Sequence, residues 1–116
     1  MKILLIHPGE SPYPSEISGS LESMQKTVGG PIQAIYPFEE PVALICHEEG
    51  KLINLPLNRP LLDENGSVYD IVAGTFFLCA APADSENFEG LSEEQINCYT
   101  DFFSYPHFCP GGITNG

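Results

Sequence analysis

The residues with the clearest chemical potential lie in the middle of the chain, in an acidic turn and the proline-flanked loop that follows it. Glu49 and Lys51 belong to the turn, and Asn58 and Arg59 belong to the loop. Arg59 is the only arginine in the sequence. A guanidinium held between two prolines can bind a carboxylate or a phosphate through two parallel hydrogen bonds. These four residues are therefore our candidate site for a small anionic ligand or a signalling nucleotide.

The same loop also has a structural interpretation. Arg59 can pair with Asp63, Asp70 or Glu48 and so stabilise a segment that has few backbone hydrogen bonds of its own. Asn58 can cap a turn through its side-chain amide. The sequence leaves both interpretations open.

Metal binding and catalysis find little support in the residue pattern. Zinc ligands usually come in pairs separated by about two to four residues. Cys46 and His47 are adjacent, so in a strand they point to opposite faces. His107 and Cys109 form the other pair, and the carboxylates lie on turns and on a predicted helix face rather than as a pair in a cleft. We therefore expect no metal, no cofactor and no enzymatic activity.

Acidic residues dominate the second half of the chain. The 116 residues include 16 acidic and four basic ones, and the net charge of −12 disfavours direct binding to nucleic acid or to an anionic membrane. Residues 1–59 carry a net charge of −3, whereas residues 60–116 hold nine acidic residues and no lysine or arginine. Nine charges match about 15 Å of duplex DNA, so this half could occupy a basic groove made for nucleic acid. We predict a protein-binding surface at Glu86, Glu89, Glu93, Glu94 and Asp101.

The simpler explanation of the charge is solubility, because small domains commonly carry about 2 to 8 net charges for that purpose alone.

The cellular location of the protein is predicted from other features of the sequence. The apolar run at residues 3–6 is shorter than the roughly 7 to 15 residues of a signal-peptide core, and no stretch approaches the roughly 20 apolar residues of a membrane span. The four cysteines include no Cys-x-x-Cys pair, which is typical of reduced thiols. We expect a cytoplasmic protein.

The elements expected in the first half begin with a strand over residues 2–6 and a loop over 12–19. A short helix starts behind Ser20 and ends at Gly29. A strand over 32–38 follows, and Pro37 indicates that its far end lies at a sheet edge. The continuous apolar run at 42–46 predicts a strand that turns at 48–50 and returns as a second strand over 51–55.

In the second half, the prolines at 56 and 60 predict irregular structure, and residues 63–66 predict a second turn. Residues 71–80 form the densest apolar run and predict one buried central strand. Ser92 and Gln95 form a capping box at the start of an amphipathic helix. At 100° per residue the apolar face of this helix holds Leu91, Ile96, Cys98, Tyr99, Phe102 and Phe103.

These elements predict a single α+β domain over residues 1–108: a small, mostly antiparallel β-sheet, with one short N-terminal helix and one amphipathic C-terminal helix packed on it. Residues 109–116 are expected to form a flexible tail. Tyr105 and Phe108 lie past the predicted helix, where they either anchor an interface or fold back over the sheet.

Several motifs together resemble domain-of-unknown-function family 3846. The resemblance covers the chain from Met1 to about Phe108, and it is carried by Val28-Gly29-Gly30, Tyr36-Pro37-Phe38, Glu48-Glu49-Gly50-Lys51-Leu52, Leu55-Pro56-Leu57-Asn58-Arg59 and Gly74-Thr75-Phe76-Phe77. Family members are small proteins of phages, plasmids and conjugative elements, mainly of anaerobic Gram-positive bacteria. The resemblance implies an accessory role in a mobile element and no particular activity. His47 stands where the family usually has asparagine, and Pro31 and Pro60 also depart from its pattern.

Two functional hypotheses follow. The first is a non-enzymatic accessory protein that binds a host or element protein, including a defence or DNA-processing factor with a basic nucleic-acid-binding surface, through its acidic C-terminal half. The alternative is a binder of a small anionic ligand at the hairpin and loop of residues 47–59, in which a homodimer could complete the pocket. A structural subunit of a larger element-encoded complex is a third hypothesis.

Overall fold

The computed structural model describes residues 1–104, and its elements confirm the predicted α+β class. The predicted domain end at residue 108, the aromatic residues at 105 and 108, the His107–Cys109 pair and the tail over 109–116 lie outside the described residues. In chain order the elements are β1 (Lys2–Ile6), β2 (Tyr13–Glu16), α1 (Leu21–Val28), β3 (Ile32–Ile35), β4 (Val42–His47), β5 (Leu57–Leu62), β6 (Val68–Ala73), β7 (Phe76–Ala80) and α2 (Glu93–Phe102).

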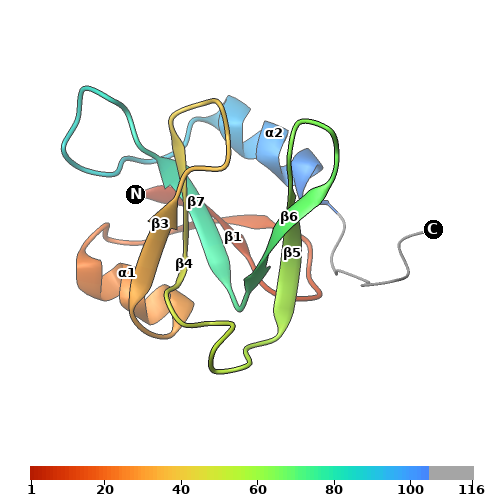
Figure 1. Ribbon diagram of the computed structural model, residues 1–116. Coiled ribbons are helices and arrows are strands. Elements are labelled where there is room, and N and C mark those ends of the chain that lie inside the picture. The colour runs from red at the N-terminus through yellow and green to blue at the C-terminus, as the bar shows by residue number, and fades with distance from the viewer. Residues whose placement is uncertain (105–116) are drawn as a thin grey trace.

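The strands form two sheets (Figure 1). Five of them make an antiparallel sheet in the order β2-β1-β7-β4-β3, so that β3 and β2 are its edges. β5 and β6 form a separate antiparallel hairpin. In Figure 1 the hairpin stands beside the five-stranded sheet near α2, whereas α1 lies at the opposite side beside β3 and β4.

The core lies on both faces of the five-stranded sheet. Successive residues of a strand point to opposite faces, so β1, β4 and β7 each contribute to two separate clusters. Leu44 and Phe76 belong to the cluster that the β5–β6 hairpin and α2 cover, and Ile45 and Phe77 belong to the cluster that α1 covers. Burial on both faces explains why these strands are continuous apolar runs in the sequence.

The two helices begin where their caps predict. Ser20 accepts a hydrogen bond from the Ser23 amide at the start of α1, and Gly29 ends that helix. Ser92 and Gln95 form the complete capping box of α2. Within residues 1–104 no helix is both long and apolar enough to span a membrane.

The loop predicted over residues 12–19 is a correction, because β2 lies within it and pairs with β1 from Lys2↔Glu16 to Leu5↔Tyr13. Its sequence has weak strand propensity and contains Pro14. Proline is tolerated there because β2 is an edge strand, which needs hydrogen bonds on one side only.

The hairpin predicted between residues 42–46 and 51–55 is wrong. β4 pairs with β3 on one side and with β7 on the other, so it has no free edge for a returning strand. Residues 51–54 instead form a compact turn, in which the amides of Ile53 and Leu55 donate to the carbonyls of Glu49 and Gly50.

Two further predictions in the middle of the chain are wrong. Residues 57–60, which were expected to be irregular, belong to β5, in which Pro60 stands opposite Ile71 and the register shifts between Leu57 and Arg59. Residues 71–80 are not one strand, because Gly74 adopts a φ of +86° and separates β6 from β7. The two halves of this apolar run therefore belong to different sheets.

The apolar face of α2 is narrower than predicted. Leu91, Ile96, Tyr99 and Phe103 are buried as expected, but Cys98 and Phe102 are exposed. Ile96, Tyr99 and Phe103 lie within about 60° of one another at 100° per residue, and this stripe joins the buried cluster on the sheet.

The Gly50→Ala variant should be destabilised by about 2 kcal/mol, because its new Cβ would lie 2.7 Å from the backbone oxygen of Ala73 in β6. Gly66→Ala is the control: its φ of +81° is strained for alanine, but nothing lies within 4 Å, so about 1 kcal/mol is expected. Urea unfolding measures both values. Equal stability of Gly50→Ala and the wild type would show that the loop after β4 is free to move away from β6.

Candidate functional site

Asn58 is fully buried at the point where the hairpin meets the five-stranded sheet. Its Nδ2 donates to the backbone oxygen of Ile6 at 2.9 Å and to that of Gly74 at 2.8 Å. Its Oδ1 accepts a hydrogen bond from Arg59 Nη1 at 2.8 Å. One side chain therefore joins the end of β1, the turn between β6 and β7, and its own neighbour in β5.

Arg59 is buried as well, with 2% of its surface exposed. Its Nε and Nη2 donate to the backbone oxygen of Phe103 at 3.3 and 3.1 Å, and Nη2 also donates to the backbone oxygen of Glu10 at 2.6 Å. Burial lowers the pKa of Arg59, although an arginine stays protonated in proteins. The guanidinium thus binds the end of α2 and the loop after β1.

Two of the three acidic residues that could pair with Arg59 have other contacts. Asp70 binds Lys51, and Asp63 Oδ1 accepts hydrogen bonds from the backbone amides of Asn65 and Ser67 within the β5–β6 turn. Glu48 is exposed beside the end of β4. The hydrogen bonds of Arg59 to carbonyl groups therefore perform the structural role that the sequence suggested for an ion pair.

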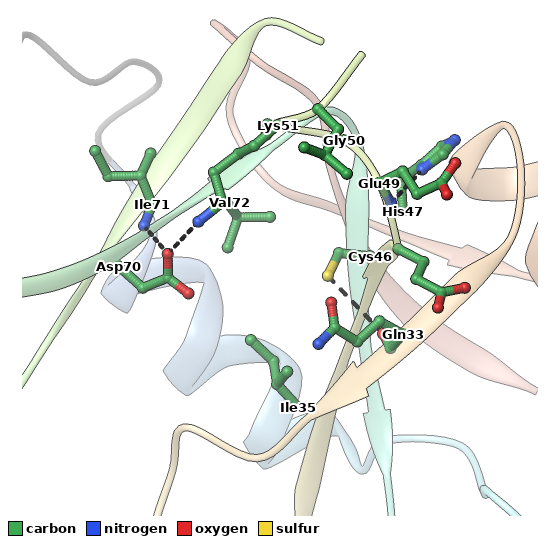
Figure 2. Close-up of a pocket in the computed structure, with 13 residues that line it drawn as sticks. Gln33, Ile35, Cys46, His47, Glu49, Gly50, Lys51, Asp70, Ile71 and Val72 are labelled. Carbon is green, nitrogen blue, oxygen red and sulfur yellow. Dashed lines mark hydrogen bonds and ion pairs between the residues drawn. The ribbon is translucent and has the colours of Figure 1, made fainter. Parts of the chain in front are cut away.

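The four residues of the proposed anion site are divided between two places. Glu49 and Lys51 line a groove of about 330 Å³ between the β3–β4 end of the large sheet and β6 (Figure 2). Asn58 and Arg59 lie in the interior and do not line this groove. The residues that complete the groove come from strands distant in the sequence: Gln33, Ile35, Cys46, His47, Asp70, Ile71 and Val72. Only knowledge of the strand pairing could have placed them together.

One ion pair, between Lys51 and Asp70, lies in this groove. Lys51 Nζ lies 2.5 Å from Asp70 Oδ1, and the same carboxylate oxygen accepts the Ile71 amide at 2.8 Å (Figure 2). The hydrogen bond from Lys51 lowers the pKa of Asp70 despite its partial burial. Glu48 and Glu49 also line the groove, so its lining residues include three acidic side chains and one lysine, and the groove carries a net negative charge.

The two potential nucleophilic or metal-binding side chains of the groove are both engaged in the fold. Burial and the Asp70 charge raise the pKa of Cys46, which keeps it in the unreactive thiol form. His47 Nδ1 accepts the Glu49 amide at 3.0 Å, and the other side of its ring packs so closely on Gly30 that a Cβ there would lie 2.4 Å from Nε2. Within residues 1–104 no group of three or more His, Cys, Asp or Glu side chains could hold a metal ion.

The second candidate site is the acidic surface, which we define as Glu86, Glu89, Glu93, Glu94 and Asp101; all five are exposed. Glu93 lies 3.7 Å from Lys2 Nζ, and among the described residues the other four take part in no ion pair. On α2, Glu93, Glu94 and Asp101 lie within about 100° of one another, opposite the buried stripe. The segment before α2 supplies the other two carboxylates.

Together these features define a small acidic α+β protein, in which a buried Asn–Arg pair joins a hairpin to a five-stranded antiparallel sheet. The chain belongs to the family described as Domain of unknown function (DUF3846), whose model matches residues 1–104. No curated protein and no solved structure matches the chain.

The Asn58→Leu variant should be destabilised by about 3 kcal/mol, because the buried oxygens of Ile6 and Gly74 would lose their donor and Arg59 would lose its side-chain acceptor. Asn97→Ala, on the exposed face of α2, should change the stability by less than about 0.5 kcal/mol. Urea unfolding compares the two variants. Similar stabilities would contradict the structural role of Asn58.

The Lys51→Met variant should raise the pKa of Asp70 toward its ordinary value, which a carboxyl NMR titration measures directly. Because the folded-state pKa of Asp70 is depressed, the carboxylate stabilises the protein at neutral pH and this stabilisation is lost as the pH falls through that pKa. The variant should therefore lose less stability on acidification than the wild type. The side chains of Lys51 and Asp70 are both partly exposed, so this difference in unfolding free energy should stay below about 1 kcal/mol.

Lys26→Met is the matched control, because Lys26 is exposed and takes part in no ion pair among the described residues. It should leave the titration of Asp70 unchanged. An equal shift of the Asp70 pKa in both variants would mean that the overall charge, and not the Lys51 contact, sets that pKa.

Proposed function

We propose that this protein is a non-enzymatic accessory protein of a mobile genetic element that binds a host or element protein through the acidic surface. Its partner is a protein with a basic patch, such as the nucleic-acid-binding face of a defence or DNA-processing factor. In this role the carboxylates occupy the positions that DNA phosphates take on the partner, and so block its nucleic-acid-binding face. The setting in phages and conjugative elements comes from the family resemblance of the sequence.

The observation that carries this proposal is that four carboxylates of the acidic surface are exposed and have no ion pair among the described residues. Unpaired like charges repel one another and destabilise a folded chain. The side chains of Glu86, Glu89 and Asp101 therefore contribute little to the fold, and their charge is available to a partner. Glu94 is exposed too, but it lies in the first turn of α2, where a carboxylate also interacts favourably with the helix dipole.

Asp101 supports the same conclusion. It lies in the last turn of α2, where the helix dipole is negative and a carboxylate is unfavourable. No basic residue compensates it in that turn. Stability alone would favour a cation at this position, so a negative charge there is better explained by an external contact or by solubility.

The anionic-ligand alternative has less support. Its key residue, Arg59, directs Nε, Nη1 and Nη2 to groups of the protein itself. The groove beside Glu49 and Lys51 carries more carboxylates than ammonium groups and would repel a phosphate or a carboxylate.

Reversing Glu86, Glu94 and Asp101 to lysine should abolish capture of basic partners. The measurement is affinity capture from a bacterial lysate with quantitative mass spectrometry, using the wild type and this triple variant as baits. We expect the captured amount of a set of DNA-binding proteins to fall at least tenfold with the variant. Added salt should release these proteins from the wild type, because salt screens contacts between exposed charges. Added duplex DNA should also displace them.

The matched control is Glu10→Lys, Glu16→Lys and Glu64→Lys, which changes the net charge by the same amount at exposed positions elsewhere. It should retain the captured set. If both triple variants lose the same proteins, the capture reflects overall charge, and the acidic surface has no specific role.

A further inference from the structure

The outer edge of β3, Ile32–Ile35, is an unpaired strand edge beside the groove. β3 ends the five-stranded sheet, and among residues 1–104 its only strand partner is β4. Unpaired edges offer a row of backbone donors and acceptors on which an extended chain can add as a further strand. Glu86 of the acidic surface lines a second pocket with Tyr36, just beyond the end of β3. β3 itself carries none of the five residues of that surface, so the inference below does not depend on the function proposed above.

The strand register identifies the groups that face outward. The Glu48 amide donates to the Pro31 oxygen, and Gln33 stands opposite Cys46, whose thiol lies 3.8 Å from the Gln33 oxygen. Hydrogen-bonded and non-hydrogen-bonded pairs alternate along an antiparallel ladder, so residues 31, 33 and 35 bond to β4. The amide and carbonyl groups of Ile32 and Ala34 therefore point away from the sheet.

Glutamate pairs lie at both ends of this edge. Glu48 and Glu49 follow β4 beside the start of β3, and Glu39 and Glu40 lie in the connection beyond the end of β3. Glu40 accepts a hydrogen bond from Tyr99, and all four glutamates are exposed. A chain that adds to β3 therefore meets negative charge at each of its ends.

This charge pattern argues against a second copy of the protein as the occupant. Antiparallel pairing of β3 with β3 would bring residues 39–40 of one copy next to residues 48–49 of the other. Like charges brought together at these ends repel each other, and each copy carries a net charge of −12. A basic chain has the complementary charge.

We propose that the outer edge of β3 binds an extended, basic segment of a partner protein as an added strand. Pro31 and Pro37 bound the edge, so the segment pairs over about five residues, or roughly 17 Å, with a lysine or arginine at each end. Side chains on one face of the added strand lie next to Gln33 and Ile35 and point toward the groove of about 330 Å³. Cys46 and Val72 also line this groove. An uncharged side chain of intermediate size suits that space.

The test uses the peptide Lys-Val-Thr-Val-Thr-Val-Lys, blocked at both ends, as the probe. Amide NMR spectra of the whole chain should show shifts concentrated at residues 32–36 and 44–49, and the affinity should fall as salt is added. The same peptide with glutamate at both ends should bind at least tenfold more weakly. Methylation of the central backbone nitrogen, which removes a donor without changing the charge, should also weaken binding at least tenfold. Shifts concentrated on α2, or equal binding of the methylated peptide, would overturn the proposal.

Two variants of the protein separate strand addition from general attraction. Glu39→Lys with Glu48→Lys should weaken binding of the lysine peptide at least tenfold. Glu94→Lys with Asp101→Lys, two exposed positions on α2 with the same change in net charge, should leave it within about twofold. Equal effects of the two pairs would overturn the proposal.

Ala34→Pro tests the backbone directly, because it removes the outward amide and leaves the β3–β4 hydrogen bonds in place. Binding should be lost in this variant while its thermal unfolding remains cooperative. If the variant does not fold, the charge pairs and the methylated peptide still decide the question.

Discussion

The arrangement of the whole molecule depends on the buried hydrogen bonds of Asn58 and Arg59. The two side chains reach the end of β1, the β6–β7 turn, the loop at Glu10 and the end of α2. A two-stranded hairpin is marginally stable alone, so these bonds, together with the packing of Leu61 and Val72, determine where it sits on the large sheet. The groove beside β6 exists because the hairpin is held at that distance.

The parts of the fold that could be predicted from the sequence are those specified by local chemistry. Ser20 and Ser92 mark the helix starts because a cap bonds to amides within one turn, and the apolar runs of β1 and β4 indicate their burial. The pairing of strands is non-local. Nothing near residues 48–55 shows that β3 and β7 already occupy both edges of β4, so a plausible hairpin was predicted there. Pro14 and Pro60 obscured β2 and β5, because strand propensity does not reveal which edge of a strand is free.

The two candidate sites also differ in how much of each could be predicted from the sequence. Charge is visible in composition, and the acidic surface is exposed as expected. The position of Arg59 is not visible, because a single arginine between prolines has the same sequence whether it faces solvent or the interior, and its acceptors at Phe103 and Glu10 are backbone oxygens that no residue pattern encodes. Asp70 binds Lys51, because the compact turn at residues 51–54 brings Lys51 to it, a contact that the sequence does not indicate.

The strand order has a consequence for how the chain folds as it is synthesised. Leu4 in β1 pairs with Leu78 in β7, and β7 also lies between β1 and β4, so the centre of the large sheet is completed by one of its last elements. Contacts between residues so distant in the sequence form slowly because a long loop must close first. The apolar side chains of β1 therefore remain without their β7 partners until residues 76–80 have left the ribosome. The two local pairs, β1–β2 and β3–β4, can form earlier and shield part of that surface in the meantime.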